Sequence, residues 1–304
     1  MPADQTTTPL VFEAIGTRWR IDSAVPCDRA LTRAILDRIA EFDQTWSRFR
    51  SDSVVAAMAL AAGSWDLGAD APPLLALYRR LADATDGAVS PFLGDALNRL
   101  GYDASYSLRE RDEPRAAAPG WDDIAGPDGL VGTGLVGTGL VGTVLTTTRP
   151  VTIDIGAAGK GYLVDLVAGL LAAAGHTAFT VDASGDIAHR GAPIRVGLEH
   201  PYDPTRAIGV VTLAGGALCA SATNRRAWGD GLHHVLDGRT GSPVEEVVAT
   251  WALAPETATA DGVATALFFA APGGLAAEFG AEGVRMFTDG RIERSPGFPG
   301  ELFR

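Results

Sequence analysis

Lysine is almost absent from this chain. Lysine and arginine together number 25, and Lys160 is the only lysine. Either one lysine has simply survived here, or this position requires a compact ammonium with rotatable donors, which the planar guanidinium of arginine cannot replace. The second alternative makes Lys160 the first candidate functional residue.

Cysteine and long hydrophobic runs are also scarce. Cys27 and Cys219 form neither a C-x-x-C pair nor a metal-ligand cluster, which is typical of reduced thiols in a cytoplasmic protein. No run approaches the about 18 apolar residues that span a membrane. The first 16 residues lack the basic start, apolar core and cleavage site of a signal peptide. We therefore expect a soluble, cytoplasmic protein with no membrane span.

Positive charge is outweighed by negative charge. The net charge is −12, and the 37 acidic residues are spread along the chain. No nucleic-acid partner is expected, because neutralising phosphates requires a basic surface. An anionic ligand would have to be held locally, by a metal, a helix N-terminus or a single cation.

Hydrophobic periodicity predicts helices first and strands later. Helices are expected over 29–46, 72–85, 90–101, 159–175 and 257–271. Strands are expected over 10–21, 150–155, 176–183, 185–191, 194–199, 207–213, 233–237 and 247–254, and a closing hairpin over 283–294 with its turn at Asp289-Gly290. This order predicts an α+β fold with a mixed sheet and packed helices. With 304 residues, 46% of them hydrophobic, we expect a single domain with a loop insertion at 103–148.

Residues 129–143, GLVGTGLVGTGLVGT, are one pentad written three times. From Gly132 they match the G-x-G-x-x-G fingerprint of dinucleotide-binding folds. That fingerprint requires a strand before the glycines and a helix directly after them. Here the preceding residues are turn-like and the following ones are β-branched up to Pro150, and any repeat of this pentad produces the match. The repeat therefore predicts an expanded surface loop.

Three other stretches carry candidate chemistry. DIGAAGKGYLVD (154–165) leads through glycines into a helix bearing Lys160, which favours anion binding, and Asp154 is either a structural cap or part of that site. Asp261 and Thr265 share one helical face and could ligate magnesium, or Asp261 could face water while Thr265 bonds to its own helix. His234 with the Asp237 region could form a base and its orienting group, or merely a polar strand edge.

Together these stretches resemble the FAD:protein FMN transferases of the ApbE family. The resemblance extends from IGTRW near the N-terminus almost to the end of the chain. It is carried, in order, by DIGAAGKGYLVD, VDASGDI, RVGLEHPYDP, HHVLDGRTGSPV and TADGVATALF.

This resemblance implies an ApbE-type, T-fold-like architecture and a magnesium-dependent enzyme. FMN would pass from FAD to a threonine hydroxyl on an acceptor flavoprotein subunit, and AMP would be released. An FAD pyrophosphatase using the same site, or a catalytically silent FAD-binding protein, remain alternatives.

The site residues that the resemblance implies fall into three groups. His234 would be the base, and Lys160 would act on the phosphates. Magnesium would be held by Asp261, Thr265 and the carbonyls of Ala157 and Ala264. FAD contacts would come from Ile15, Phe49, Ala88, Val89, Ser90, Asp154, Lys160 and Val235. The chain departs from the family pattern where Phe49 replaces a tyrosine, Ser90 an aspartate and Gly238 a proline.

Overall fold

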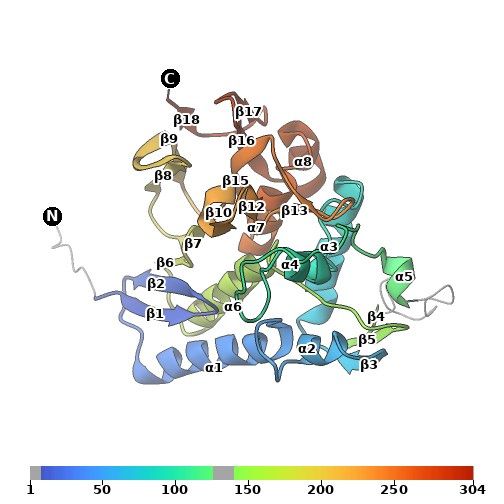
Figure 1. The fold of residues 1–304 in the computed structure, drawn as a ribbon. Helices are drawn as coiled ribbons and strands as arrows, with labels where there is room; N and C mark the ends of the chain where they lie inside the picture. Colours follow the sequence, from blue (N-terminus) through green and yellow to red (C-terminus); the bar gives the residue numbers. More distant parts are fainter. Residues whose placement is uncertain (1–7, 126–139, 304) are drawn as a thin grey trace, which may run out of the picture. The chain divides into compact units, whose positions relative to one another are not determined.

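The computed structural model describes residues 8–125 and 140–303. These residues form two compact units, each assembled from separate segments of the chain (Figure 1). The first unit contains residues 8–40, 158–222 and 247–303, and the second contains residues 41–125, 140–157 and 223–246. Among the described helices, none combines the length and apolar character needed to cross a membrane.

An eight-stranded sheet organises the first unit, in the order β1-β2-β6-β7-β10-β15-β16-β17, and its neighbouring strands pair antiparallel. Its alternating apolar residues fit the two-residue period of a strand, so each strand presents one side chain to each face in turn. The strands are β1 Leu10–Ala14, β2 Thr17–Ser23, β6 Phe179–Asp182, β7 Asp186–Arg190, β10 Gly216–Ala222, β15 Val247–Ala254, β16 Glu282–Phe287 and β17 Ile292–Arg294.

A smaller three-stranded sheet, β18-β9-β8, lies beside the large one in the first unit. It consists of β8 Ile194–His200, β9 Asp203–Leu213 and β18 Glu301–Leu302. Buried residues of β8 and β9, such as Leu198 and Val211, share a hydrophobic core with Leu218 and Trp251 of the large sheet. This core fills one face of the large sheet.

The helices of the first unit cover the other face. These helices are α6 Gly159–Ala173, α7 Thr257–Ala266 and α8 Pro272–Phe279, with the first part of α1 Arg29–Trp46. Leu218 belongs to the core between the sheets, whereas the next residue, Cys219, directs its thiol to the Thr257 carbonyl of α7. Because successive strand residues point to opposite faces, α7 lies against the face that the small sheet leaves uncovered.

The second unit is built from short helices, small sheets and loops. Its helices are the end of α1, α2 Val54–Met58, α3 Ala71–Ala84, α4 Gly94–Arg99, α5 Trp121–Ala125 and the 3₁₀ turn η1 Thr223–Arg226. Its strands are β3 Gly63–Asp66, β4 Leu140–Val141, β5 Val144–Thr147, β11 Ala227–Trp228, β12 Leu232–His233, β13 Leu236–Asp237 and β14 Ser242–Pro243.

The α+β prediction is confirmed, and most predicted elements are present. The single strand expected over 10–21 is instead the β1–β2 hairpin, whose turn places Ile15 and Gly16 at φ 48° and 71°. The strand expected over 150–155 is wrong. This segment belongs to none of the described strands; its N–H groups donate from Val151 to the Met58 carbonyl at the end of α2 and from Asp154 to the Pro91 carbonyl.

Two other predictions concern the strand at 233–237 and the triple repeat. The strand expected over 233–237 is split into β12 and β13, which pair with different partners. Of the triple repeat, residues 129–139 lie outside the described residues, so the prediction of a surface loop there stays a prediction. The last copy contributes Leu140 and Val141 to β4, which pairs with β5 across a turn at Gly142.

Candidate active site

In the first unit, helix α6 begins directly beside α7. The Gly161 N–H donates to the Asp261 carboxylate at 2.9 Å. A Cβ at position 161 would lie 2.4 Å from the Thr257 carbonyl oxygen and 2.6 Å from the Asp261 Cβ, so any larger residue would push the two helices apart. Gly161 therefore brings Asp261 to the N-terminal turn of α6, where Lys160 is located.

Lys160 lies between two buried carboxylates. Its ammonium forms an ion pair with Asp186 on β7 and donates to the Ala183 carbonyl at 3.1 Å. Asp186 is 0% exposed and Asp261 is 4% exposed. Burial lowers the pKa of Lys160, but the charges of Asp186 and Asp261 outweigh it and raise this pKa above its ordinary value. The cation is thus fixed in place and charged.

The carboxylates outnumber the cation in this cluster. Burial raises the pKa of Asp261 well above its usual range, the negative charge of Asp186 raises it further, and Lys160 opposes both. Two ionised carboxylates facing one ammonium would repel each other in a region of low dielectric, so Asp261 tends to hold a proton. A bound cation would replace that proton and favour the ionised carboxylate.

The remaining first-unit ligands predicted for magnesium lie on α7. The Ala264 carbonyl accepts a hydrogen bond from the Thr250 hydroxyl at 2.6 Å, and a carbonyl oxygen keeps a second lone pair after one such bond. Thr265, half-buried, follows Asp261 by one helical turn. The described residues contain no group of three or more His, Cys, Asp or Glu that could hold a metal ion by themselves. A carboxylate, a hydroxyl and a carbonyl are hard oxygen donors, which magnesium accepts when phosphates supply further ligands.

A third carboxylate, Asp165, fixes the start of α7. Its two oxygens accept the backbone N–H groups of Thr257 and Ala258, each at 2.8 Å. Since the first N–H groups of a helix have no partner within the helix, Asp165 on α6 supplies the cap that α7 lacks in its own sequence. This bond pair sets the position of Asp261 one turn further along.

In the second unit, Asp154 holds an arginine that the sequence did not single out. Arg48 donates to the Asp154 carboxylate at 2.5 Å and to the Asn98 side chain at 3.0 Å. The other Asp154 oxygen accepts the Gly156 N–H at 2.8 Å. Burial raises the pKa of Asp154, but Arg48 outweighs it and holds this pKa below its usual value. Asp154 is therefore an ionised anchor for the glycine segment, as the capping alternative proposed.

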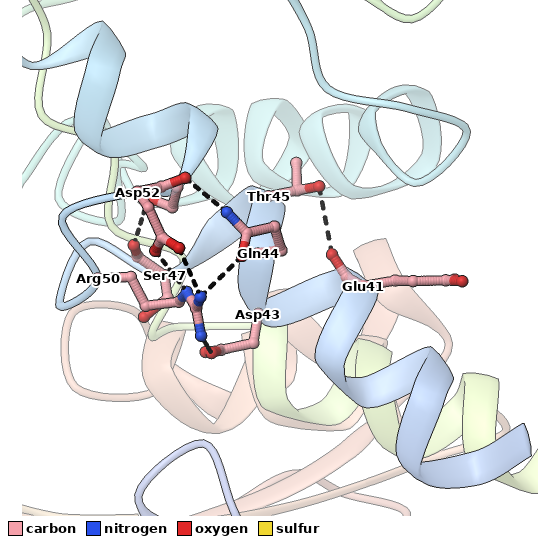
Figure 2. A network of polar contacts seen from close by, with 8 residues as sticks. Glu41, Asp43, Gln44, Thr45, Ser47, Arg50 and Asp52 are labelled. Atoms are coloured by element: carbon pink, nitrogen blue, oxygen red, sulfur yellow. Dashed lines mark hydrogen bonds and ion pairs between the residues drawn. The ribbon is translucent and has the colours of Figure 1, made fainter. Parts of the chain in front are cut away.

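The segment that precedes Phe49 is held by its own polar network (Figure 2). The Arg50 guanidinium donates to Gln44 at 2.7 Å and to both Asp52 oxygens at 3.0 and 2.9 Å. Gln44 in turn donates to the Asp52 carbonyl at 2.5 Å. These bonds join the last turn of α1 to the loop after it, and so fix Arg48 and Phe49 between them.

The Ala88–Ser90 stretch is buried and tightly bonded. Val89 donates its N–H to the Thr85 hydroxyl at 3.0 Å, and the Ser90 hydroxyl accepts the Phe92 N–H at 3.1 Å. The Ala88 carbonyl accepts the Gly238 N–H at 2.8 Å. A Cβ at Gly238 would lie 2.5 Å from the Gly87 carbonyl oxygen, which explains why the chain has glycine here.

His234 is held as a neutral imidazole. Burial, together with the positive charge of Arg226, lowers its pKa to about 4. The ring bonds to the backbone of Arg226, while its buried Nδ1 has no hydrogen-bond partner among the described residues. His233, the last residue of β12, bonds elsewhere, to the Val244 carbonyl at 2.9 Å. His234 thus carries a lone pair that could accept a proton.

The other predicted residues lie as follows. Val235 is buried next to His234, and its carbonyl accepts the Val244 N–H. The Ala157 N–H donates to the Tyr78 hydroxyl at 3.1 Å. Asp237 bonds to the Arg239 side chain and not to a histidine among the described bonds, so the structure does not support it as the orienting group. Ile15 stands in the β1–β2 turn with a positive φ, which is rare and costly for a β-branched residue.

Sequence reasoning missed Asp186, Arg48 and Asp165. Asp186 and Asp165 lie inside stretches already singled out, VDASGDI and DIGAAGKGYLVD, so a search for every acid in those stretches would have found them. Arg48 precedes Phe49 and carries no such signal, because its partner Asp154 is 106 residues away.

Comparison with known proteins places this arrangement in one family. The family model described as "ApbE family" matches residues 15–281. The FAD:protein FMN transferase of Klebsiella pneumoniae is 25% identical over 89% of this chain and 81% of its own length. That of Rhodobacter capsulatus is 30% identical over 83% of this chain and 49% of its own length, so the chain spans about half of it. The crystal structure of the ApbE protein from Thermotoga maritima superposes with a TM-score of 0.77 at 25% identity, covering 97% of this chain and 99% of that one. The chain belongs to the ApbE family.

Proposed function

We propose that this chain is a magnesium-dependent FAD:protein FMN transferase. It transfers FMN from FAD to a threonine hydroxyl of an acceptor flavoprotein subunit and releases AMP. Family membership and the names of its relatives support a flavin transferase that acts on a protein. The magnesium requirement is supported by the residues discussed below, whereas the threonine and the released AMP are what the family resemblance implies.

The buried cluster of Lys160, Asp186 and Asp261 is the observation that carries this proposal. A surplus carboxylate in a nearly inaccessible place is costly unless a cation accompanies it. Within the first unit, Asp261, the Thr265 hydroxyl and the Ala264 carbonyl would hold magnesium. When bound, magnesium supplies charge neutralisation for the pyrophosphate of FAD, a role it commonly has in phosphoryl transfer.

The chain's own groups would complete the phosphate site. The N-terminus of the 15-residue helix α6 offers a positive dipole end to an anion, although its Gly161 N–H is already bonded to Asp261. Lys160 stands on its first turn and adds a full positive charge. Asp186 and the Ala183 carbonyl hold that ammonium in one position, so no reorganisation is needed when phosphate arrives.

His234 is proposed as the base. The threonine oxygen of the acceptor would form a bond to the flavin-side phosphorus while the phosphorus–oxygen bond to AMP breaks. The hydroxyl proton would pass to the free Nδ1 of His234, and AMP would leave with the bridging oxygen and its electron pair. The lowered pKa supports this role because the ring is unprotonated at neutral pH.

The resemblance implies FAD contacts in the second unit and, separately, one residue of the first unit. In the second unit these are Phe49, Asp154, Val235 and the buried Ala88–Ser90 stretch. In the first unit Ile15 is proposed, and its strained backbone supports the choice because such strain persists mainly at functional positions.

The proposal is tested by following AMP release and protein-bound flavin together. Purified protein is mixed with FAD and magnesium chloride, with and without a candidate acceptor subunit. Transfer predicts flavin that stays on the denatured acceptor in amounts equal to AMP. AMP with free FMN in both mixtures would instead establish the FAD pyrophosphatase alternative, with water as nucleophile.

Two variants assign the roles. Asp261→Ala is expected to lose AMP release even at saturating FAD, whereas alanine at the exposed Asp230 leaves it unchanged. His234→Ala is expected to bind FAD and turn over roughly 10²–10⁴-fold more slowly, the usual contribution of a general base. Full turnover by Asp261→Ala would remove the metal assignment, and lost binding with intact turnover per bound FAD would remove the base.

A further inference from the structure

The segment from Gly101 to Arg111 is strained and firmly bonded. Tyr106 and Leu108 have φ values of 50° and 51°, in the left-handed region that non-glycine residues rarely adopt. The Asp103 carboxylate accepts the N–H groups of Ser105 and Ser107 at 3.0 and 3.1 Å, and these serines' hydroxyls at 2.7 Å each. These bonds hold the pKa of Asp103 well below its usual range. Such strain persists only where surrounding bonds over-determine the backbone.

This strained backbone presents one aromatic ring to solvent. The Tyr106 ring stacks on Phe49, with centroids 5.2 Å apart and planes 7° from parallel, and meets Tyr102 edge-on at 5.6 Å. Tyr106 is 52% exposed, whereas Tyr102 is 5% exposed. A half-exposed ring contributes little to the stability of the fold, yet the backbone at Tyr106 is strained to present it. Binding of a ligand explains this strain better than folding does.

The rings beneath Tyr106 form a rigid support. Tyr102 stacks on Trp228, with centroids 5.6 Å apart and planes 18° from parallel, and its hydroxyl accepts a hydrogen bond from Arg226 at 2.6 Å. The Arg48 guanidinium lies 4.2 Å from the centre of the Phe49 ring. Phe49 is fixed in addition by the network around Arg50 (Figure 2). These contacts all lie within the second unit.

We propose that Tyr106 is a flavin-binding residue, on whose exposed face the isoalloxazine ring of the substrate stacks. The inference rests on the proposed function, because that function supplies a planar aromatic ligand. Aromatic rings attract each other in offset stacking, and the phenol of tyrosine is electron-rich whereas oxidised isoalloxazine is electron-poor.

Binding of separate ligands to Tyr106→Leu tests the proposal. FAD and FMN are titrated by flavin fluorescence, and ADP by calorimetry, with magnesium present throughout. Leucine removes the ring, so FAD and FMN should bind about 3- to 10-fold more weakly, the scale of one aromatic pair. ADP has no flavin and should bind as to the wild type. Tyr106→Phe keeps the ring and should stay within about twofold.

A matched control and a second measurement separate binding from folding. Tyr202, 61% exposed in the turn between β8 and β9, is replaced by leucine and should change neither FAD nor FMN affinity. Bound flavin should fluoresce more strongly in Tyr106→Leu than in the wild type, because a stacked phenol quenches flavin emission.

The outcomes distinguish this inference from the proposed function. A wild type that binds neither FAD nor FMN overturns both. A wild type that binds FAD, with Tyr106→Leu binding FAD and FMN equally well, overturns the role of Tyr106 alone. Equal weakening of FAD and ADP would show that Tyr106 acts on the adenine end or on folding, and would also overturn it.

Discussion

Replacing Lys160 by methionine tests the buried charge cluster most directly. Methionine has a similar length and no charge, so Asp186 and Asp261 would face each other without the ammonium. Removing one partner of a buried ion pair costs about 3–5 kcal/mol, because the remaining charge is left uncompensated. For a chain of this size we expect the melting temperature to fall by roughly 6–15 °C.

Magnesium should offset part of this loss. The variant has two buried carboxylates where the wild type has two carboxylates and one ammonium, so a divalent cation gains more there. We expect magnesium chloride to raise the melting temperature of Lys160→Met by more than it raises that of the wild type. Thermal unfolding with and without magnesium measures both effects.

Two further variants test whether the two carboxylates cause the loss of stability in Lys160→Met. Adding Asp186→Asn to Lys160→Met removes one of the two carboxylates and should recover a large part of the lost stability, as in a double-mutant cycle. The exposed Arg294 on β17, replaced by methionine, should change stability by less than about 0.5 kcal/mol. If Lys160→Met loses less than about 1 kcal/mol and the second substitution adds nothing, the carboxylates do not depend on the lysine.

Four other predictions follow from separate sites. Gly238→Ala should cost about 1–3 kcal/mol in urea unfolding and weaken FAD binding, because its Cβ meets the Gly87 carbonyl; unchanged stability would contradict this. Ile15→Gly should relieve backbone strain of about 1 kcal/mol yet lower FAD affinity, whereas a gain in both would remove Ile15 from the site. The pKa of His234, about 4, lies below its unfolded value of about 6.5. Its contribution to stability is therefore present above pH 6.5 and is lost as the pH falls toward 4. The free energy of unfolding of His234→Gln should depend less on pH in that window, and equal dependence would refute the assignment. Deleting residues 134–143 should change stability by roughly 1 kcal/mol or less and FAD affinity by a few-fold at most, since the retained copy of the pentad has the same residues for β4; lost binding in a folded protein would make the glycines the site.

The sequence predicted what depends on local pattern. Helix α1 was expected over the residues it occupies, since its apolar stripe repeats every three to four residues. The segment 150–155 has the β-branched residues of a strand, but pattern alone does not reveal whether a neighbouring strand is available. Its N–H groups donate instead to the carbonyls of Met58, at the end of α2, and of Pro91. The pairing of this segment was therefore not predictable from its pattern.

The candidate site was likewise predicted only where local sequence pattern was informative. Composition singled out Lys160. Helical spacing left the role of Asp261 open, and only the family resemblance implied it as a metal ligand. Their common partner Asp186 was not found, because a carboxylate becomes unusual only when folding buries it beside another charge. For Asp237, the sequence suggested a contact that the described hydrogen bonds do not include. Its nearness to His234 in the sequence suggested an orienting group, but it bonds to Arg239, two residues away.

The surroundings of Lys160 also explain why this position has a lysine and not an arginine. The Lys160 ammonium approaches Asp186 and the Ala183 carbonyl from the first turn of α6, where Gly159, Gly161 and Asp261 are all buried. A guanidinium carries its donors in a fixed plane and occupies more volume, so it could not meet both partners in this space without moving the helix. Lys160→Arg would therefore keep the charge and lose the position. Since phosphoryl transfer depends chiefly on the placement of charge, a charge kept in the wrong place would be expected to leave FAD binding only partly impaired and transfer strongly reduced.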